Sequence, residues 1–494
     1  MIMEFSWLAV LEEFLKVIFG AIVMSALAAI GYIFKEYILW RFIKTRNSSY
    51  SNDTFARETI KYRFNNIFSS INKTVSSDKP ILSYKTFQDT LVGSLEFTDN
   101  SALLTQGNEI NKAFMKLWVD QTLTKYKNAK VSTFLSKSNF IDAEYLFYYY
   151  ILDKLNNLDL DSKKKLHPEY CPDVQFDPYK IRKIKMLEDD FINDSEEKSG
   201  SSYKSKIKPC LNIIARVNGR MDDASWKDLI YESSTNILQL NLSSNSSDLS
   251  QMFWSDFNSV YPHINHSKKF WIEYMNDVAN KNVHIIVDNF GIEFLSDLVL
   301  GYCLKIKGAC TVTYHVKHLP IFVSDVVEND QILMFETLKK LLSESKENEE
   351  KKTDYINALN SLENMAKESF RFKANYFFNM PFGFAELQPN KLKIERPDAL
   401  KLIKETYSIF TGEDLLIIKG DLNYRRLVED KLWNHRVKTS SRIKYATAPM
   451  LVIRSYKSSV VMDCSSAKVK SLVSEYGPDW KTDGQVGAIL FFNN

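Results

Sequence analysis

In Asp414-Leu-Leu-Ile-Ile-Lys-Gly-Asp-Leu-Asn-Tyr-Arg-Arg426, an apolar run ends abruptly in a cluster of polar and charged residues. The apolar run predicts a buried strand, because strands of parallel sheets are covered on both faces and read as continuous hydrophobic segments. Ligands of open α/β sheets bind just beyond the carboxyl ends of such strands. The residues that follow this run are therefore candidates for a binding site: Lys419, Asp421, Asn423 and Arg425.

Two further apolar runs end in a similar way. The β-branched run Val283-His-Ile-Ile-Val287 stops at Asp288 and Asn289, ahead of a helical pattern that begins at Glu293. Thr311-Val-Thr-Tyr-His315 predicts another strand, and the apolar run Pro320-Ile-Phe-Val-Ser-Asp325 leads on to a carboxylate. Asp288, Asn289 and Asp325 form a set of oxygen ligands, which suits Mg²⁺ or Mn²⁺.

A fourth strand is predicted near the C-terminus. Pro449-Met-Leu-Val-Ile-Arg-Ser-Tyr-Lys457 is apolar until it closes on two cations. Lys and Arg beside a divalent ion neutralise phosphate oxygens, Arg with a bidentate fork and Lys as a point charge. We therefore expect Arg454 and Lys457, together with Lys419 and Arg425, to hold a phosphate group beside the metal.

These segments together resemble the metal-dependent damage-control phosphatases of subfamily III. The resemblance rests on Val287-Asp-Asn-Phe-Gly-Ile-Glu293, on Lys419-Gly-Asp-Leu-Asn-Tyr-Arg425, and on Arg454-Ser-Tyr-Lys457, which is similar to the Arg-Thr-x-Lys motif of that subfamily. Outside the site, Thr54-Phe-Ala-Arg-Glu-Thr-Ile-Lys-Tyr-Arg63 is similar to the opening segment of the family, and the stretch from Trp480 to Ile489 to its closing strand.

The resemblance implies an α/β/α sandwich with a helical N-terminal subdomain, and hydrolysis of sugar phosphates such as fructose 1-phosphate or fructose 6-phosphate. It implies that Asp288, Asn289 and Asp325 are catalytic and bind the metal, which is Mn²⁺ or alternatively Mg²⁺, Co²⁺ or Ni²⁺. Whether water or Asp288 is the nucleophile stays open. The implied substrate-binding residues are Asp288, Asn289, Glu293, Lys419, Asp421, Leu422, Asn423, Tyr424, Arg425, Arg454 and Lys457.

Two other functions stay open. A protein carboxyl (glutamate) methyltransferase activity that uses S-adenosylmethionine is also ascribed to the subfamily, but such a cofactor prefers a glycine-rich turn and Gly291 is the one candidate. A catalytically idle, membrane-tethered binding module is the second alternative. It is favoured by departures from the family pattern at Asn245-Ser-Ser-Asp-Leu-Ser250 and at Met462-Asp-Cys464.

The N-terminal segment predicts a membrane anchor. The run from Val17 to Phe34 contains no charge and is just long enough for a helix to cross the hydrocarbon core. Acidic residues dominate before it, whereas Lys35, Arg41, Lys44 and Arg46 follow. Because an excess of Lys and Arg marks the cytoplasmic side, the catalytic domain is expected in the cytosol. An unanchored cytosolic protein is the alternative.

The layout predicts a membrane anchor with a basic flank at 1–46, a helical subdomain at 47–192, a flexible linker at 193–208 and the α/β phosphatase domain at 209–494. Strands of that domain are expected to start at Ile237-Leu-Gln-Leu-Asn-Leu242. The nearly balanced net charge of +3 excludes a nucleic-acid-binding protein with a concentrated basic face. The five scattered cysteines fit a reducing compartment. The oligomeric state stays open.

Overall fold

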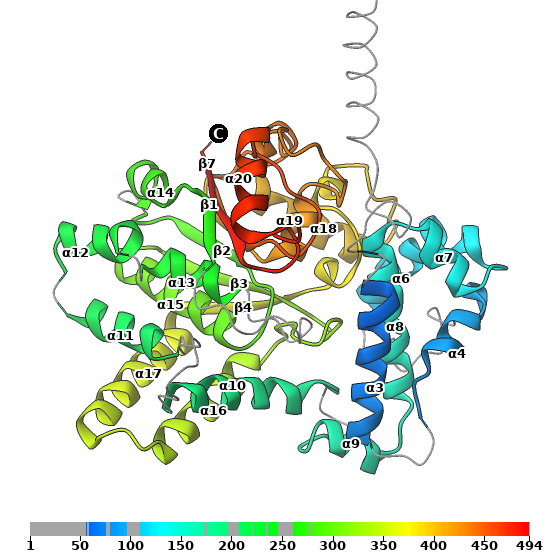
Figure 1. Cartoon of the computed structure of the whole chain (residues 1–494), viewed down its shortest axis with the longest axis horizontal. Coiled ribbons are helices and arrows are strands. Elements are labelled where there is room, and N and C mark those ends of the chain that lie inside the picture. Colours follow the sequence, from blue (N-terminus) through cyan, green and yellow to red (C-terminus); the bar gives the residue numbers. More distant parts are fainter. Residues whose placement is uncertain are drawn as a thin grey trace, which may run out of the picture.

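Figure 1 shows the computed structural model, which describes residues 56, 59–75, 80–95, 109–171, 175–195, 207–219, 221–233, 236–245, 260–275 and 278–493. The predicted membrane helix at 17–34 lies outside these residues and stays a prediction. Within the described ranges, no helix combines the length and the apolar character needed to cross a membrane.

The described strands form one sheet in the order β1-β7-β6-β5-β2-β3-β4. Strands β2 to β6 run parallel, β7 is antiparallel to β6, and β1 is parallel to β7. The four strands predicted from apolar runs are confirmed as β2, β3, β5 and β6. The bounds are β1 Tyr261–Asn265, β2 Asn282–Ile286, β3 Thr311–Lys317, β4 Phe370–Asn375, β5 Leu415–Lys419, β6 Met450–Ser455 and β7 Val486–Phe492.

Two hydrophobic cores lie on opposite faces of the sheet, because successive residues of each strand point to opposite sides. Ile285 and Ile417 pack into one core, and their neighbours Ile286 and Ile418 into the other. Helices cover both faces, as Figure 1 shows, so the architecture is a three-layered α/β/α arrangement. The first face is covered by α10 Lys180–Ser195, α11 Ile207–Asn218, α12 Asp223–Lys227, α13 Ile237–Ser244, α14 Ser267–Glu273, α15 Ile292–Ile306, α16 Asp330–Glu344 and α17 Glu349–Ser369.

The second face is covered by α18 Pro397–Thr411, α19 Asp421–Leu427 and α20 Ser466–Tyr476. The same core continues into the N-terminal helices, blue to cyan in Figure 1. These are α3 Phe64–Val75, α4 Tyr84–Asp89, α6 Glu109–Trp118, α7 Val131–Lys137, α8 Phe140–Asn156 and α9 Leu160–Leu166. The aromatic run Tyr145–Tyr150 belongs to α8 and is buried, and neighbouring Phe rings stack on it, as Phe64 does on Phe147 with centroids 3.6 Å apart.

The strand predicted at Ile237–Leu242 is wrong, because this segment is the helix α13. Asn236 starts the helix by accepting a hydrogen bond on its side chain from Gln239 N at 2.8 Å. The helix packs against α15 and β6 and is buried all round, so no polar face reveals its 3.6-residue period. The ends of the predicted linker are also helical, in α10 and α11, and residues 196–206 lie outside the described part.

The chain reverses direction across the sheet at the neighbouring strands β2 and β5. From β2 the chain continues through α15 to β3, whereas from β5 it continues through α19 to β6, on the other side of the pair. Such a reversal opens a crevice at the carboxyl ends of the strands, which is where α/β sheets bind ligands. Gly291 and Gly420 precede the two helices with φ of 90° and 85°, a conformation that glycine adopts readily.

Candidate functional site

Asp288 lies at the carboxyl end of β2, two residues beyond the strand, where such a crevice is expected. Its side chain rests against the backbone of Gly420, such that a Cβ atom at position 420 would lie 1.8 Å from Asp288 Oδ2. Position 420 therefore requires glycine for two reasons, the positive φ and the close approach of the carboxylate. The glycine in the quoted Lys-Gly-Asp sequence is thus part of the site.

The structure brings the three predicted metal residues together. Asn289 and Asp325 form an isolated antiparallel bridge, which joins the turn after β2 to the loop after β3. Asn289 Nδ2 donates to Asp288 Oδ2 at 3.2 Å and to Glu293 Oε2 at 2.9 Å. Ser324 Oγ donates to Asn289 Oδ1 at 2.7 Å. The amide side chain is therefore fixed between the carboxylates.

Lys317 supplies a cation that the sequence reasoning did not assign to the site. It is the last residue of β3, and its Nζ contacts Asp325 Oδ1. Burial opposes its charge, but the carboxylates of Asp325 and Asp288 outweigh that effect and raise the pKa of Lys317. One signal could have found it: Lys317 closes an apolar strand just as Lys419 does.

Burial and neighbouring carboxylates together disfavour the charge of Asp288 more than the nearby cations favour it. The pKa of Asp288 is raised well above its ordinary value, chiefly by burial and then by the charge of Glu293, while Lys317 and Lys457 act in the opposite direction. A shift of this kind means that ionised Asp288 needs additional positive charge nearby. A bound divalent cation would provide it.

Asn245 connects Glu293 to the end of β6. Its Nδ2 donates to Glu293 Oε1 at 2.7 Å, and its Oδ1 accepts from Ser455 N at 2.7 Å and from Ser455 Oγ at 2.9 Å. Asn245 is fully buried at the end of α13. It therefore sets the position of Glu293 relative to the strand end that carries Lys457.

Arg454, Asp421 and Tyr424 form one packed unit on the other side of the crevice. Arg454 Nη2 contacts Asp421 Oδ1, and its guanidinium carbon lies 4.0 Å from the centroid of the Tyr424 ring. The Tyr424 hydroxyl is 2.8 Å from Thr439 Oγ1, so the ring is anchored at its far end. In this structure Tyr424 acts by supporting Arg454.

Asn423 ties the two central strands together at their ends. Its Nδ2 donates to Val287 O at 3.1 Å and to Lys419 O at 2.9 Å. Its Oδ1 is buried and has no hydrogen-bond partner among the described residues, so it is an acceptor available to a ligand. The neighbouring Leu422 packs against the second core and contributes no polar side chain.

Two predicted phosphate ligands are placed elsewhere. Lys419 is fully buried on the α13 and α15 side of the sheet, where Nζ lies 2.9 Å from Asp297 Oδ1 and donates to Asn241 Oδ1 at 2.8 Å. Strand alternation causes this, since Ile418 already occupies the opposite face. Lys419 is therefore paired with Asp297 in this structure, and its contact with substrate stays a prediction.

Arg425 is likewise held in a buried ion-pair network. Its Nε and Nη2 donate to the two carboxylate oxygens of Asp430 at 2.7 and 3.1 Å, and its Nη1 donates to Glu144 Oε2 at 2.8 Å. It thus joins α19 to α8 of the helical subdomain. Its guanidinium is thus paired with two carboxylates in this structure, and its contact with the phosphate stays a prediction.

The predicted metal residues fit a hard divalent ion by their donor chemistry. Among the described residues, no group of three or more His, Cys, Asp and Glu side chains could hold a metal. The predicted set draws its third oxygen from the amide of Asn289, beside the carboxylates of Asp288 and Asp325. Two carboxylates and one amide, with further positions for water or substrate, match the preferences of Mg²⁺ and Mn²⁺.

Comparison with known proteins identifies the family of this chain. Residues 103–473 match the family described as the damage-control phosphatase ARMT1-like domain. The damage-control phosphatase ARMT1 of Danio rerio is 30% identical over 217 residues, covering 43% of this chain and 44% of that protein. The Xenopus tropicalis protein of the same name is 26% identical over 311 residues, covering 62% of each chain.

The human damage-control phosphatase ARMT1 is 23% identical over 329 residues, covering 61% of this chain and 68% of the human protein. A solved structure of a DUF89 family protein from Pyrococcus horikoshii is 15% identical, with a TM-score of 0.34, over 84% of this chain and 93% of that one. The alignment with the Danio rerio relative spans less than half of that protein. The family match covers most of the present sequence, and this chain belongs to the damage-control phosphatase ARMT1-like family.

Proposed function

We propose that the protein is a metal-dependent phosphomonoester hydrolase that acts on sugar phosphates of the fructose 1-phosphate or fructose 6-phosphate type, as metabolite damage control. Family membership supports a phosphatase that repairs metabolites. One observation carries the proposal: Asp288, Asn289 and Asp325 converge beyond the ends of β2 and β3, where Lys317 and Lys457 favour the ionised form of Asp288.

The metal would be held by Asp288, Asn289 and Asp325, and Mn²⁺ is the proposed ion, with Mg²⁺, Co²⁺ or Ni²⁺ as alternatives. When bound, such an ion polarises a phosphoryl oxygen and stabilises the charge that develops on it. The Asp288 carboxylate packs against the backbone of Gly420, and Ser324 Oγ donates to Oδ1 of the Asn289 amide, so both side chains are held in place.

The phosphate would be held by cations that point into the same crevice. Lys317 and Lys457 both favour the ionised form of Asp288, and their charges would also act on the non-transferred phosphate oxygens. Both side chains are buried, at 3% and 6% exposure, and fixed charges in a water-poor site stabilise a transition state strongly. These two lysines take the role predicted for Lys419 and Arg425.

The sugar would be oriented by acceptors beside the phosphate. Asn423 offers its buried Oδ1, and Glu293 offers a carboxylate whose position is set by Asn245 and Asn289. Hydroxyl groups of a sugar are donors that satisfy such acceptors. The pairing of sugar hydroxyl groups with these acceptors would determine which of the two fructose phosphates is the preferred substrate.

No observation favours the methyltransferase alternative. A Cβ atom at Gly291 would lie 2.0 Å from Met186 Cε of α10, so the glycine is explained by packing and the space above it is filled. The membrane anchor at residues 17–34 and the cytosolic location of the catalytic domain stay proposals from sequence. Release of the protein from membranes by a carbonate wash would contradict the anchor.

The experiment is a release assay for inorganic phosphate with the full chain and a panel of sugar phosphates. We expect fructose 1-phosphate or fructose 6-phosphate to be hydrolysed with Mn²⁺, the activity to stop with a chelator, and Mn²⁺ to restore it. The absence of hydrolysis with every metal, together with no thermal shift on adding Mn²⁺ or phosphate, would favour the idle module. Methyl transfer from labelled S-adenosylmethionine without added metal would favour the methyltransferase.

A further inference from the structure

Asp325 is carried by the loop 318–325, which follows β3 and contains no helix or strand. At the end of this loop, Phe322 N donates to Asp325 Oδ2 at 2.8 Å, and the backbone of Asp325 bridges to Asn289. Because the loop has no regular secondary structure, the position of the Asp325 carboxylate depends on the contacts that hold the rest of the loop.

Asn379 holds the first two residues of this loop. Its Oδ1 accepts from His318 N at 2.9 Å, and its Nδ2 donates to Leu319 O at 3.0 Å. Asn379 is fully buried, so an apolar side chain in its place would leave both backbone groups without this partner. The amide therefore fixes the loop at the point where it leaves β3, directly after Lys317.

Asn379 is itself bonded to the helical subdomain. It is the last residue of the 3₁₀ helix η7 Tyr376–Asn379, which follows β4. The Tyr149 hydroxyl of α8 donates to Asn379 O at 2.8 Å. The Tyr145 hydroxyl, one turn earlier in α8, donates to Phe378 O at 3.2 Å. The segment that holds the loop is thus held by α8.

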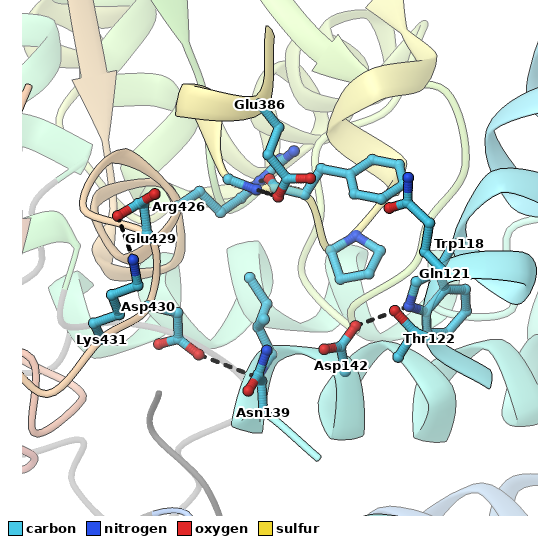
Figure 2. A pocket seen from close by; sticks show the side chains of 14 residues that line it. Trp118, Gln121, Thr122, Asn139, Asp142, Glu386, Arg426, Glu429, Asp430 and Lys431 are labelled. Carbon is cyan, nitrogen blue, oxygen red and sulfur yellow. Dashed lines mark hydrogen bonds and ion pairs between the residues drawn. The ribbon is translucent and has the colours of Figure 1, made fainter. Parts of the chain in front are cut away.

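Arg426 of α19 fixes the same segment from the catalytic domain. Arg426 lines a cavity of about 270 Å³ between the helical subdomain and the segments 381–386 and 426–431 (Figure 2). Its Nη2 donates to Phe377 O at 3.0 Å and its Nη1 to Phe378 O at 3.3 Å. Since bonds from both domains converge on η7, Asn379 fixes the loop relative to both.

Helix α8 also contacts the loop directly, at Phe322. The centroid of the Phe322 ring lies 4.5 Å from that of Tyr148 and 5.2 Å from that of Tyr145. Lys317 Nζ lies 5.0 Å from the same Phe322 centroid. The residue whose N–H orients the Asp325 carboxylate is therefore packed between α8 and a cation of the site.

We propose that Asn379 is a positioning residue for Asp325: it holds the loop 318–325 so that the Asp325 carboxylate stands beside Asn289 and Asp288. This inference rests on the proposed metal site. Groups that orient a metal ligand commonly change the metal affinity by about 10–100-fold when they are removed. The helical subdomain then contributes to the metal site through α8 and η7, without contact with the metal.

The test is isothermal titration of the full chain with Mn²⁺, in the absence of substrate. We expect Asn379→Leu, which has a similar size but no amide, to bind Mn²⁺ about tenfold more weakly than the wild type. Tyr149→Phe removes only the hydroxyl that donates to Asn379 O, and it should weaken binding in the same direction by at least threefold. This second variant decides the outcome if Asn379→Leu does not fold.

The titration also separates positioning from a loss of stability. Partial unfolding lowers the number of Mn²⁺ sites per chain, whereas a displaced Asp325 lowers the affinity of each site. Asn72→Leu is the matched control, because Asn72 Oδ1 accepts from Leu82 N at 2.9 Å and its Nδ2 donates to Leu82 O at 2.6 Å. This amide holds the segment between α3 and α4, which carries no residue of the site, so its Mn²⁺ affinity should equal that of the wild type.

The inference is overturned if the wild type binds Mn²⁺ and both Asn379→Leu and Tyr149→Phe bind it with an affinity within threefold of the wild type. It is also overturned if only the number of sites falls, or if Asn72→Leu weakens the affinity as much as Asn379→Leu does. A wild type that binds no Mn²⁺ would contradict the proposed metal site, and this inference with it.

Discussion

Replacing Gly420 with alanine should disable the catalytic crevice. The added Cβ would lie 1.8 Å from Asp288 Oδ2 and 2.4 Å from Asp288 Cγ. Since ordinary non-bonded contact begins at roughly 3.5 Å, the carboxylate has to retreat by about 1.7 Å. A displacement of about 1 Å in a catalytic group can lower the rate by about 10²-fold, so we expect kcat/KM for the sugar phosphate to fall at least that far.

Gly477→Ala is the matched control. Gly477 has φ of 84°, almost the same as the 85° of Gly420, but no atom lies within 4 Å of its added Cβ. Both variants therefore carry a similar backbone strain of about 1–3 kcal/mol, whereas only the alanine at position 420 collides with a side chain. The free energy of unfolding should fall in both, and the activity only in Gly420→Ala.

The assay combines phosphate release with Mn²⁺ and chemical denaturation of the three proteins. The reasoning is refuted if Gly420→Ala keeps kcat/KM within threefold of the wild type, since the Asp288 carboxylate would then tolerate displacement. A comparable loss of activity in Gly477→Ala would also refute it, because strain at a distant glycine would then suffice.

Three further outcomes are expected. Lys317→Met removes the cation that contacts Asp325 and should lower kcat of the sugar phosphatase reaction by about 10²-fold. Lys317→Arg should retain more activity. Equal rates in both variants would count against a role for the charge. Asn245→Ala should raise KM by about tenfold with a smaller effect on kcat, because Glu293 loses its orientation. An unchanged KM would show that Asn245 does not position Glu293 for substrate binding. Burial raises the pKa of Asp142 to about 7, so the folded protein holds a proton that the unfolded chain releases, and stability is lost as pH rises from about 4 to 7. Urea unfolding at pH 5 and 7 should therefore show that the free energy of unfolding of Asp142→Asn rises relative to that of the wild type as the pH rises, by at most about 1.4 kcal/mol per pH unit. The opposite trend would contradict the buried proton.

The central strands could be predicted from sequence because they are buried on both faces. The runs at Val283, Thr311, Leu415 and Pro449 are apolar and β-branched, and each stops at polar residues. The same reasoning failed at α13, where Ile237-Leu-Gln-Leu-Asn-Leu242 alternates like a strand. A short helix that contacts its neighbours on all sides has no exposed face, so its period cannot be recognised from polarity.

The candidate site could be predicted only in part. Asp288, Asn289 and Asp325 follow strand ends, and the parallel sheet brings such ends together. The direction of Lys419 depends on which face of β5 it occupies, which requires the register of the folded sheet. Glu144 in α8, one of the two partners of Arg425, is 281 positions away in the chain, so this contact could not be predicted from the local sequence.

The positioning role of Asn245 was missed for a related reason. Its hydrogen bonds to Glu293 and Ser455 span 48 and 210 positions of sequence. These contacts depend on the packing of α13, whose secondary structure was assigned incorrectly from the sequence. Local sequence cannot reveal hydrogen-bond partners that are brought together by tertiary packing alone.

The measurement that tests the central claim most directly is the Mn²⁺-dependent rate of phosphate release from fructose 1-phosphate and fructose 6-phosphate by Asp288→Ala, compared with the wild type. We predict a fall of about 10³-fold in kcat, because the variant removes the carboxylate at the centre of the metal and phosphate residues. A rate equal to that of the wild type would contradict the assignment of the crevice at β2 and β5 as the catalytic site.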